Sequence, residues 1–344
     1  MFYYMTKILF FFLLMLGTLI SVSSNSWLGI WMGLEINLMA FIPLMMNPNN
    51  LVNSESNLNY FLIQTFASMF MLMTLLINLL LMKMMCINLL MNNTMMMKII
   101  IMLPLLLKLG MSPFHFWLPI IMMKLNWYNS MILVTWQKLA PMMIISYLIS
   151  MNSLTITIIL FSIFTGAIMG LNQTSLQKIL AYSSINHMGW MLSAMMFNKT
   201  MWNYYFLIYS LLNISLMFMF NLMKIFYLNQ IYYWMSNYLT KIYFMSMLLS
   251  LGGMPPLLGF LPKWLIIQVF MIMKFNLLIM SMILMSLITL YFYLKISLSS
   301  FMMNYNEMNY LTNNNLNIFL FSTIISMTFF SLFTLNFLIL MFFM

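Results

Sequence analysis

Apolar stretches of about 20 residues recur along almost the whole chain, separated by short segments rich in asparagine, serine and lysine. A helix needs about 20 apolar residues to cross the hydrocarbon core of a bilayer. Since no water is available there, each spanning segment must satisfy its own backbone hydrogen bonds as a helix. The alternation of apolar and polar residues that is typical of a membrane β-barrel is absent from the sequence. The pattern therefore predicts an all-α integral membrane protein.

The stretches predict eleven transmembrane helices. We expect them near residues 3–22, 25–46, 58–83, 95–121, 127–149, 152–171, 175–197, 201–228, 239–271, 275–299 and 318–342. The first stretch is interpreted as a span, because it is long for a signal peptide and lacks a small-residue cleavage site. The longest polar segment, Asn304–Asn315, is too short to form a domain. Nearly all of the chain is therefore expected to lie in the membrane.

Two of these spans cannot be continuous helices. The fourth carries Pro104, Gly110, Pro113 and Pro119, and the ninth carries three glycines and three prolines within 252–262. Proline inside a helix removes a hydrogen bond and clashes with the preceding turn. Interrupted helices at matching positions in two halves indicate an internal repeat.

The interruptions lie five spans apart, which divides the chain into repeats. We expect a first five-helix repeat at 1–150, broken near 108–119, and a second at 151–300, broken near 252–263. Residues 301–344 would form a loop and a final helix. Because five is an odd number of spans, the two repeats must be inverted with respect to each other.

Composition supports the membrane assignment and excludes several functions. Of the 344 residues, 65% are hydrophobic and 5% are charged, whereas a soluble domain carries roughly 25% charged residues. The net charge of +10 comes from scattered lysines, so a nucleic-acid partner is not expected. One cysteine, Cys86, and two distant histidines exclude an iron–sulfur, haem or metal site within this chain. The 49 methionines and the abundant asparagine indicate an AT-rich genome that reads an extra codon as methionine, as animal mitochondrial genomes do.

Four of the 16 formally charged residues are expected deep inside the membrane and not at the ends of the spans: Glu35, Lys108, Lys138 and Lys263. A charge at the bilayer centre costs about 2.5–3.5 kcal/mol on insertion scales, so each is a functional candidate. Glu35 and Lys108 form a natural pair, because a buried charge without a partner is strongly disfavoured.

The other two lysines, Lys138 and Lys263, lie in different parts of the predicted spans. Lys138 lies near the middle of its span, too deep to extend its ammonium group to either surface. Burial disfavours the charged form of lysine, which would let Lys138 take up and release protons. Lys263 follows the second break, where it either lines a hydrated cavity or, beside Trp264, marks the membrane interface.

His187 and Lys178 admit two interpretations each, and His115 is given one. Ser183 and His187 share a helix face, which suits either a proton wire or polar contacts between packed helices. His115, in the first interrupted segment, is interpreted as structural. Lys178 is interpreted as an interfacial anchor, the alternative being the mouth of the same wire.

These residues lie in motifs that resemble a known family, the animal mitochondrial NADH dehydrogenase subunit 2, and especially its insect forms. The motifs are Asn25–Asn37, Ser112–Trp117, Thr135–Lys138, Gly170–Thr174, Ser184–Trp190 and Gly252–Pro256. The resemblance implies an antiporter-like membrane-arm subunit of respiratory complex I, in the mitochondrial inner membrane, with other membrane-arm subunits as partners. It implies that FMN, iron–sulfur clusters and ubiquinone are bound by other subunits and that this chain binds no cofactor. Cardiolipin beside interfacial lysines is a further expectation.

The resemblance also implies roles for the buried charges. Glu35 and Lys108 would form the pair that modulates proton affinity, Lys138 would be the central relay, and Lys263 would face a neighbouring subunit. Gln177 occupies a position where relatives often have arginine, so no charge acts there in this chain.

These roles lead to a hypothesis with three alternatives. Redox chemistry elsewhere would shift Lys108 against Glu35, change the proton affinity of Lys138 and pass charge to Lys263. The alternatives are a subunit of a sodium/proton antiporter, a structural spacer, and a stand-alone transporter. We expect no small-molecule substrate other than protons, since the sequence shows no substrate-sized polar cluster.

Overall fold

A computed structural model describes residues 2–46, 51–82, 95–234 and 238–302. Within these ranges the chain is helical and forms no strand, apart from an isolated bridge between Ser175 and Tyr227. The chain divides into two compact units, Met1–Ile158 and Ile159–Met344. Cys86, Glu307, the Asn304–Asn315 segment and the predicted final helix lie outside the described residues.

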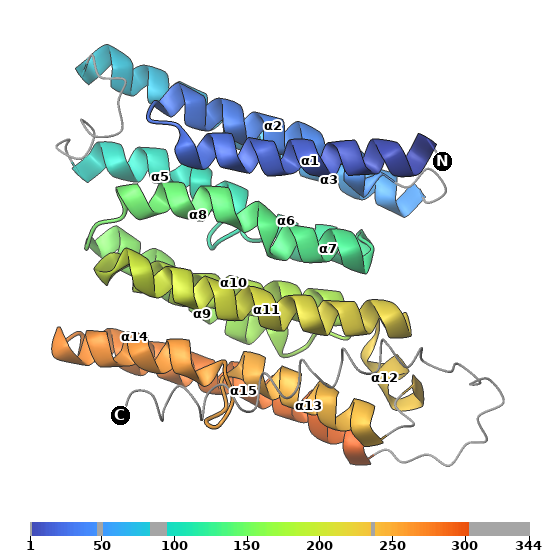
Figure 1. Cartoon of the computed structure of the whole chain (residues 1–344). Helices are drawn as coiled ribbons and strands as arrows, with labels where there is room; N and C mark the ends of the chain where they lie inside the picture. The colour runs from blue at the N-terminus through green and yellow to red at the C-terminus, as the bar shows by residue number, and fades with distance from the viewer. Residues whose placement is uncertain (1, 47–50, 83–94, 235–237, 303–344) are drawn as a thin grey trace, which may run out of the picture. The chain divides into compact units, whose positions relative to one another are not determined.

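Unit 1 begins with a pair of closely packed antiparallel helices (Figure 1). Its helices are α1 (Phe2–Ser23), α2 (Trp27–Met45), α3 (Leu51–Met82), α5 (Met95–Leu109), α6 (Trp117–Lys124), α7 (Trp127–Val134) and α8 (Trp136–Leu148). Gly17 and Gly33 lie where α1 and α2 meet, and a Cβ atom on Gly33 would come within 2.6 Å of the Ser21 backbone nitrogen. Small residues let membrane helices approach this closely.

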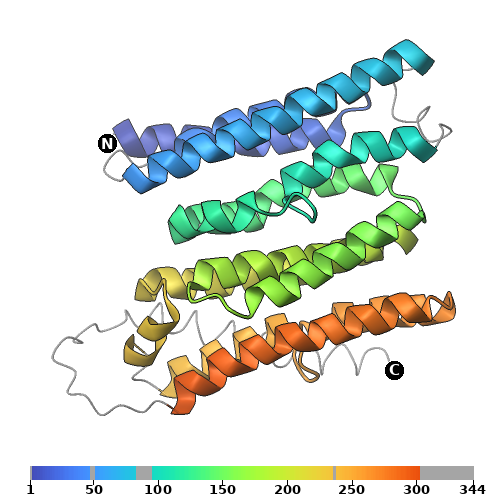
Figure 2. The same ribbon diagram turned by 180° about the vertical axis from the view of Figure 1, so that it is seen from behind.

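Unit 2 is built around α10 (Leu176–Phe197), in which 18 of 22 residues are buried. The boundary between the units falls within α9 (Ser153–Gly170). The other helices are α11 (Lys199–Met223), α12 (Leu228–Trp234), α13 (Tyr238–Gly252), α14 (Phe260–Ile272) and α15 (Asn276–Met302) (Figure 2). Gly166 and Gly189 bring α9 and α10 together, since a Cβ atom on either would clash with the opposite helix.

Each unit contains a non-helical segment between two short helices. In unit 1, α5 ends at Leu109, Gly110 adopts φ +69°, and α6 begins at Trp117. In unit 2, α13 ends at Gly252, Gly253 adopts φ +82°, and α14 begins at Phe260. Glycine is the residue that adopts positive φ without steric cost, so both helix ends follow directly from the sequence.

Among the described residues, seven helical segments are long and apolar enough to cross a membrane. They are Met5–Ser23, Trp27–Met45, Leu51–Asn78, Trp127–Leu148, Ser153–Gly170, Lys199–Met223 and Asn276–Ser300. The two interrupted segments are not among these seven spans, because each of their helices is at most 15 residues long. The 22-residue helix α10 is long enough but is not among the seven, because serines, Asn186 and His187 lower its hydropathy.

Three helix boundaries differ from the sequence prediction. The third helix starts at Leu51 and not near 58, so its first turns contain the polar residues before Asn57. The predicted span 201–228 ends at Met223, because Lys224 adopts a left-handed conformation. The span 127–149 is divided at Thr135 into α7 and α8. Pro141, inside α8, lacks the N–H that would continue the helical ladder there.

Candidate functional site

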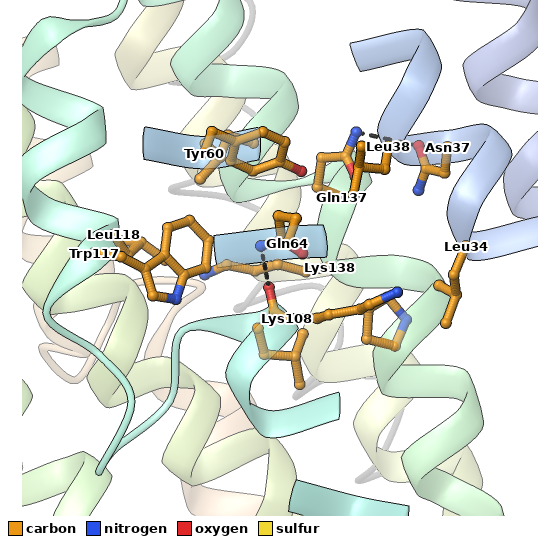
Figure 3. A pocket seen from close by; sticks show the side chains of 13 residues that line it. Leu34, Asn37, Leu38, Tyr60, Gln64, Lys108, Trp117, Leu118, Gln137 and Lys138 are labelled. Atoms are coloured by element: carbon orange, nitrogen blue, oxygen red, sulfur yellow. Dashed lines mark hydrogen bonds between the residues drawn. The ribbon is translucent and has the colours of Figure 1, made fainter. Parts of the chain in front are cut away.

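A small polar cavity lies inside unit 1 (Figure 3). Its polar lining comes from α2, α3, α5 and α8 and consists of Asn37, Tyr60, Gln64, Lys108, Gln137 and Lys138. The space open to the centre of a water molecule is about 20 Å³, which is enough to hold at least one water. The cavity therefore combines polar groups with room for a proton-carrying molecule inside an apolar bundle.

Lys108 reaches this cavity from the last turn of α5. Its side chain is 8% exposed, and within the described residues its Nζ has no hydrogen-bond partner. Two neutral donors hold the end of its helix: Gln64 Nε2 donates to the Lys108 carbonyl over 3.4 Å, and Trp117 Nε1 donates to the Leu107 carbonyl over 3.1 Å. The backbone of Lys108 is thus fixed while its amino group points into the cavity.

Lys138 lines the same cavity from the first turn of α8 and is 2% exposed. The neighbouring Gln137 donates a hydrogen bond of 3.1 Å from Nε2 to Asn37 Oδ1, which ties α8 to α2 (Figure 3). Two predicted site residues, Lys108 and Lys138, are therefore brought to one cavity. Such a pair of buried amines can exchange protons through whatever polar molecule occupies the space between them.

Glu35 lies on α2 but does not line the cavity. Its side chain is half-buried, and it makes no salt bridge to Lys108 among the residues whose positions are described. Its carboxylate nevertheless interacts electrostatically with the Lys108 ammonium group. The two groups thus interact through space and without direct contact.

Lys263 lies in unit 2, in the first turn of α14, and is 4% exposed. Its Nζ donates a hydrogen bond of 2.8 Å to the Gly252 carbonyl and lies 5.9 Å from the centre of the Trp190 ring. The carbonyl end of a helix carries partial negative charge and attracts a cation. The interruption in unit 2 therefore places a lysine at the end of α13.

His187 is buried on α10, with 6% of its side chain exposed. Its Nδ1 lies 2.9 Å from the Tyr205 hydroxyl of α11, and its ring centre lies 5.1 Å from that of Tyr209. His115, in the first interrupted segment, is 5% exposed and stacks near Phe116 at 4.2 Å. The structure thus gives His187 a polar partner and places the His115 ring against Phe116.

A family model described as "NADH:quinone oxidoreductase/Mrp antiporter, TM" matches residues 24–289 of the chain. This match covers both polar regions, from just before α2 to the middle of α15. The chain is also similar to curated proteins from insects and mammals. It is 52% identical to NADH-ubiquinone oxidoreductase chain 2 of Aedes aegypti, over 96% of this chain and 98% of that protein. It is 50% identical to the same protein of Anopheles gambiae, over 90% of both, and 40% identical to that of Equus asinus, over 83% of both.

The chain belongs to the NADH-ubiquinone oxidoreductase chain 2 family. Its fold is shared by more distant membrane proteins. A chain of respiratory complex I from Thermus thermophilus superposes with a TM-score of 0.83 at 20% identity, covering 95% of this chain and 77% of that one. A chain of the Mrp complex from a Dietzia species gives a TM-score of 0.75 at 16% identity, covering 83% and 58%. At these identities the likeness concerns the fold alone.

In this member of the chain 2 family, the predicted site residues have further polar neighbours that the sequence did not predict. Tyr60 and Gln64 line the cavity from α3, and Tyr205 contacts His187 from α11. The hydropathy of their helices does not indicate that these residues point inward. A membrane helix is apolar on all sides, so its inward face cannot be identified from periodicity. Across the described ranges there is no group of three or more histidine, cysteine or acidic residues that could hold a metal ion.

Proposed function

We propose that this chain translocates protons across the mitochondrial inner membrane as a membrane-arm subunit of NADH:ubiquinone oxidoreductase. The relatives are named as a chain of that enzyme, and their identity extends over most of the sequence. The redox reaction, with FMN, iron–sulfur clusters and ubiquinone, takes place in other subunits. This chain contributes buried proton-accepting groups, and protons are its only substrate.

The observation that carries the proposal is Lys138, which is 2% exposed and lines a polar cavity together with Lys108. A lysine held in apolar surroundings is close in free energy to its neutral form, so a nearby change in charge can load or unload it. Glu35 supplies such a charge, because its carboxylate interacts electrostatically with the Lys108 ammonium. A shift of Lys108 toward Glu35 would remove positive charge from the cavity and favour protonation of Lys138.

The topology that we propose has eleven transmembrane helices in two inverted five-helix repeats followed by one helix. The repeats are residues 1–150 and 151–300, and the remainder is 301–344. The interrupted helices α5–α6 and α13–α14 each provide one span, and α10 provides another. Each interruption lies beside a buried lysine, Lys108 in one repeat and Lys263 in the other.

Lys263 is proposed to be the last proton-accepting group of this chain and to face a neighbouring membrane-arm subunit. His187, also buried in unit 2, is proposed to take part in the relay. His187 lies within the family motif Ser184–Trp190, and Lys263 follows the family motif Gly252–Pro256 in the same interrupted segment. Phospholipid, including cardiolipin, is proposed to surround the exposed apolar faces.

The test is Lys138→Met, which keeps the length of the side chain and removes the amine. Membrane vesicles that contain the assembled complex are assayed for NADH oxidation and for proton uptake with a pH-sensitive dye. We expect fewer protons translocated per NADH oxidised at an unchanged amount of complex. Lys295→Met, at an exposed position on α15, is the matched control and should leave the ratio unchanged.

Two results would contradict the proposal. An unchanged ratio in the Lys138→Met complex would show that this amine carries no protons. Loss of the complex itself in Lys138→Met, and equally in Met replacements of Lys108 and Lys263, would favour a structural spacer over a proton pump.

A further inference from the structure

His187 and Tyr205 form a buried hydrogen-bonded pair between α10 and α11. The distance from His187 Nδ1 to Tyr205 Oη is 2.9 Å, and the two ring centres lie 5.9 Å apart at 61°. The exposed fractions are 6% for the histidine and 2% for the tyrosine. A buried hydroxyl group is usually hydrogen-bonded, so this contact determines which of the two side chains donates and which accepts.

The direction of this hydrogen bond follows from the partners of the tyrosine. Within the described part of the chain, the only hydrogen bond of the Tyr205 hydroxyl is the one to His187 Nδ1. If the histidine donated instead, the buried hydroxyl hydrogen would have no acceptor, which is costly in an apolar interior. Tyr205 therefore donates, and His187 Nδ1 accepts. In a neutral imidazole one nitrogen is the acceptor and the other carries the hydrogen, so the hydrogen of His187 is on Nε2.

We propose that the Tyr205 hydroxyl sets the tautomer of His187 and passes the proton to its Nδ1, and thereby sets the direction in which this histidine passes protons. This inference rests on the proposed function, because it assumes that His187 lies on the proton path. It adds a residue on a different helix, which the relay of lysines and glutamate does not include.

One proton crosses the Tyr205–His187 pair in linked transfers. A proton reaches the lone pair of Tyr205 Oη while the Oη–H bond breaks and its hydrogen forms a new bond to His187 Nδ1. The Nε2–H bond of the same imidazole breaks, and that proton leaves to the next acceptor. One proton enters at the hydroxyl and one leaves at Nε2, and both side chains remain neutral. The imidazole hydrogen then lies on Nδ1, so the imidazole must turn before Nδ1 can accept from Tyr205 again. Without the hydroxyl, Nδ1 loses the donor that fixes the tautomer of the imidazole.

The neighbouring tyrosines offer a matched control. Tyr293 on α15 is 1% exposed, and its hydroxyl makes no hydrogen bond to His187 in the described structure. Tyr205→Phe and Tyr293→Phe therefore remove the same atom from equally buried rings in the same unit. Only the first removes a hydrogen bond to the histidine.

The experiment measures protons translocated per NADH oxidised in membrane vesicles, normalised to the amount of assembled complex. The variants are Tyr205→Phe, His187→Leu, both together, and Tyr293→Phe. We expect Tyr205→Phe to lower the ratio by the same fraction as His187→Leu, the double variant to be no lower than either, and Tyr293→Phe to match the unchanged chain. A purely structural role would change the amount of complex and leave the ratio as it was.

Several results would overturn the inference. These are a normal ratio in Tyr205→Phe, additive losses in the double variant, or failure of Tyr205→Phe to assemble while Tyr293→Phe assembles. A normal ratio in His187→Leu would also exclude it. If Lys138→Met still lowers the ratio in that case, the proposed function stands and only the role of the pair is lost.

Discussion

Lys263 Nζ donates a hydrogen bond of 2.8 Å to the carbonyl oxygen of Gly252, the last residue of α13. The next residue, Gly253, makes this contact sterically feasible, because a Cβ atom there would come within 2.9 Å of Nζ and 3.0 Å of Cδ. Its φ of +82° is also a conformation that residues with a Cβ atom rarely adopt. The glycine therefore serves both the turn and the position of the lysine.

Replacement of Gly253 by alanine should displace Lys263 and destabilise unit 2. The left-handed backbone costs a residue with a Cβ atom about 1–2 kcal/mol, and the lysine must give up its bond to Gly252 to make room. We expect a lower temperature of half-inactivation and fewer protons translocated per NADH. Gly252→Ala is the control, since its Cβ atom would meet its nearest neighbour at 3.4 Å. Equal behaviour of the two variants would contradict the steric argument.

Removal of the charge at Glu35 should uncouple proton translocation from NADH oxidation. Its carboxylate interacts electrostatically with Lys108, whose amino group has no hydrogen-bond partner in the described structure. In Glu35→Gln we therefore expect a normal amount of complex with a reduced ratio of protons to NADH. Glu55→Gln removes the same charge from a side chain that is 65% exposed, and its ratio should be normal. If both variants pump normally, Glu35 is a structural glutamate.

The membrane class and the family were predictable from the sequence, because both depend on local signals. Apolar stretches of spanning length and the motifs around Glu35 and Lys138 are read along the chain, without knowledge of packing. The interrupted segments lie where Gly110 and Gly253 follow the ends of α5 and α13, and glycine with proline is a strong local signal.

The residues that complete the cavity could not be predicted in the same way. Tyr60 and Gln64 reach it through the rotation of α3 about its axis, which depends on how the helices pack. The division of a span at Thr135, three residues before Lys138, was also missed. The only proline of this span, Pro141, lies inside α8 and six residues after Thr135, so it does not mark the division.

The ion pair between Glu55 and Lys124 should contribute little to stability. Lys124 Nζ lies 2.7 Å from Glu55 Oε2, but the side chains are 22% and 65% exposed, respectively. Exposed ion pairs are typically worth about 0–1 kcal/mol and are screened by salt. We therefore expect Glu55→Gln to change the temperature of half-inactivation only slightly, and less at high salt than at low salt. A large loss that does not depend on salt would show that Glu55 has another partner.

The hydrogen bond between Gln137 and Asn37 should couple α2 to α8, the helices that carry Glu35 and Lys138. Gln137 Nε2 donates to Asn37 Oδ1 over 3.1 Å at the edge of the cavity. Side-chain hydrogen bonds between membrane helices are worth on average about 0.6 kcal/mol and at most about 1.7 kcal/mol. The measurement is a double-mutant cycle with Asn37→Leu, Gln137→Leu and both, read from the thermal inactivation of the assembled complex.

The sign of the coupling in this cycle separates two roles of the pair. If the hydrogen bond holds the helices together, each single variant leaves a buried amide without its partner, and the double variant is more stable than the sum of the two losses predicts. We expect this result, together with a lower ratio of protons to NADH in all three variants, because the spacing between Glu35 and Lys138 is no longer fixed. If the losses add, the two amides act independently and each serves only to line the cavity.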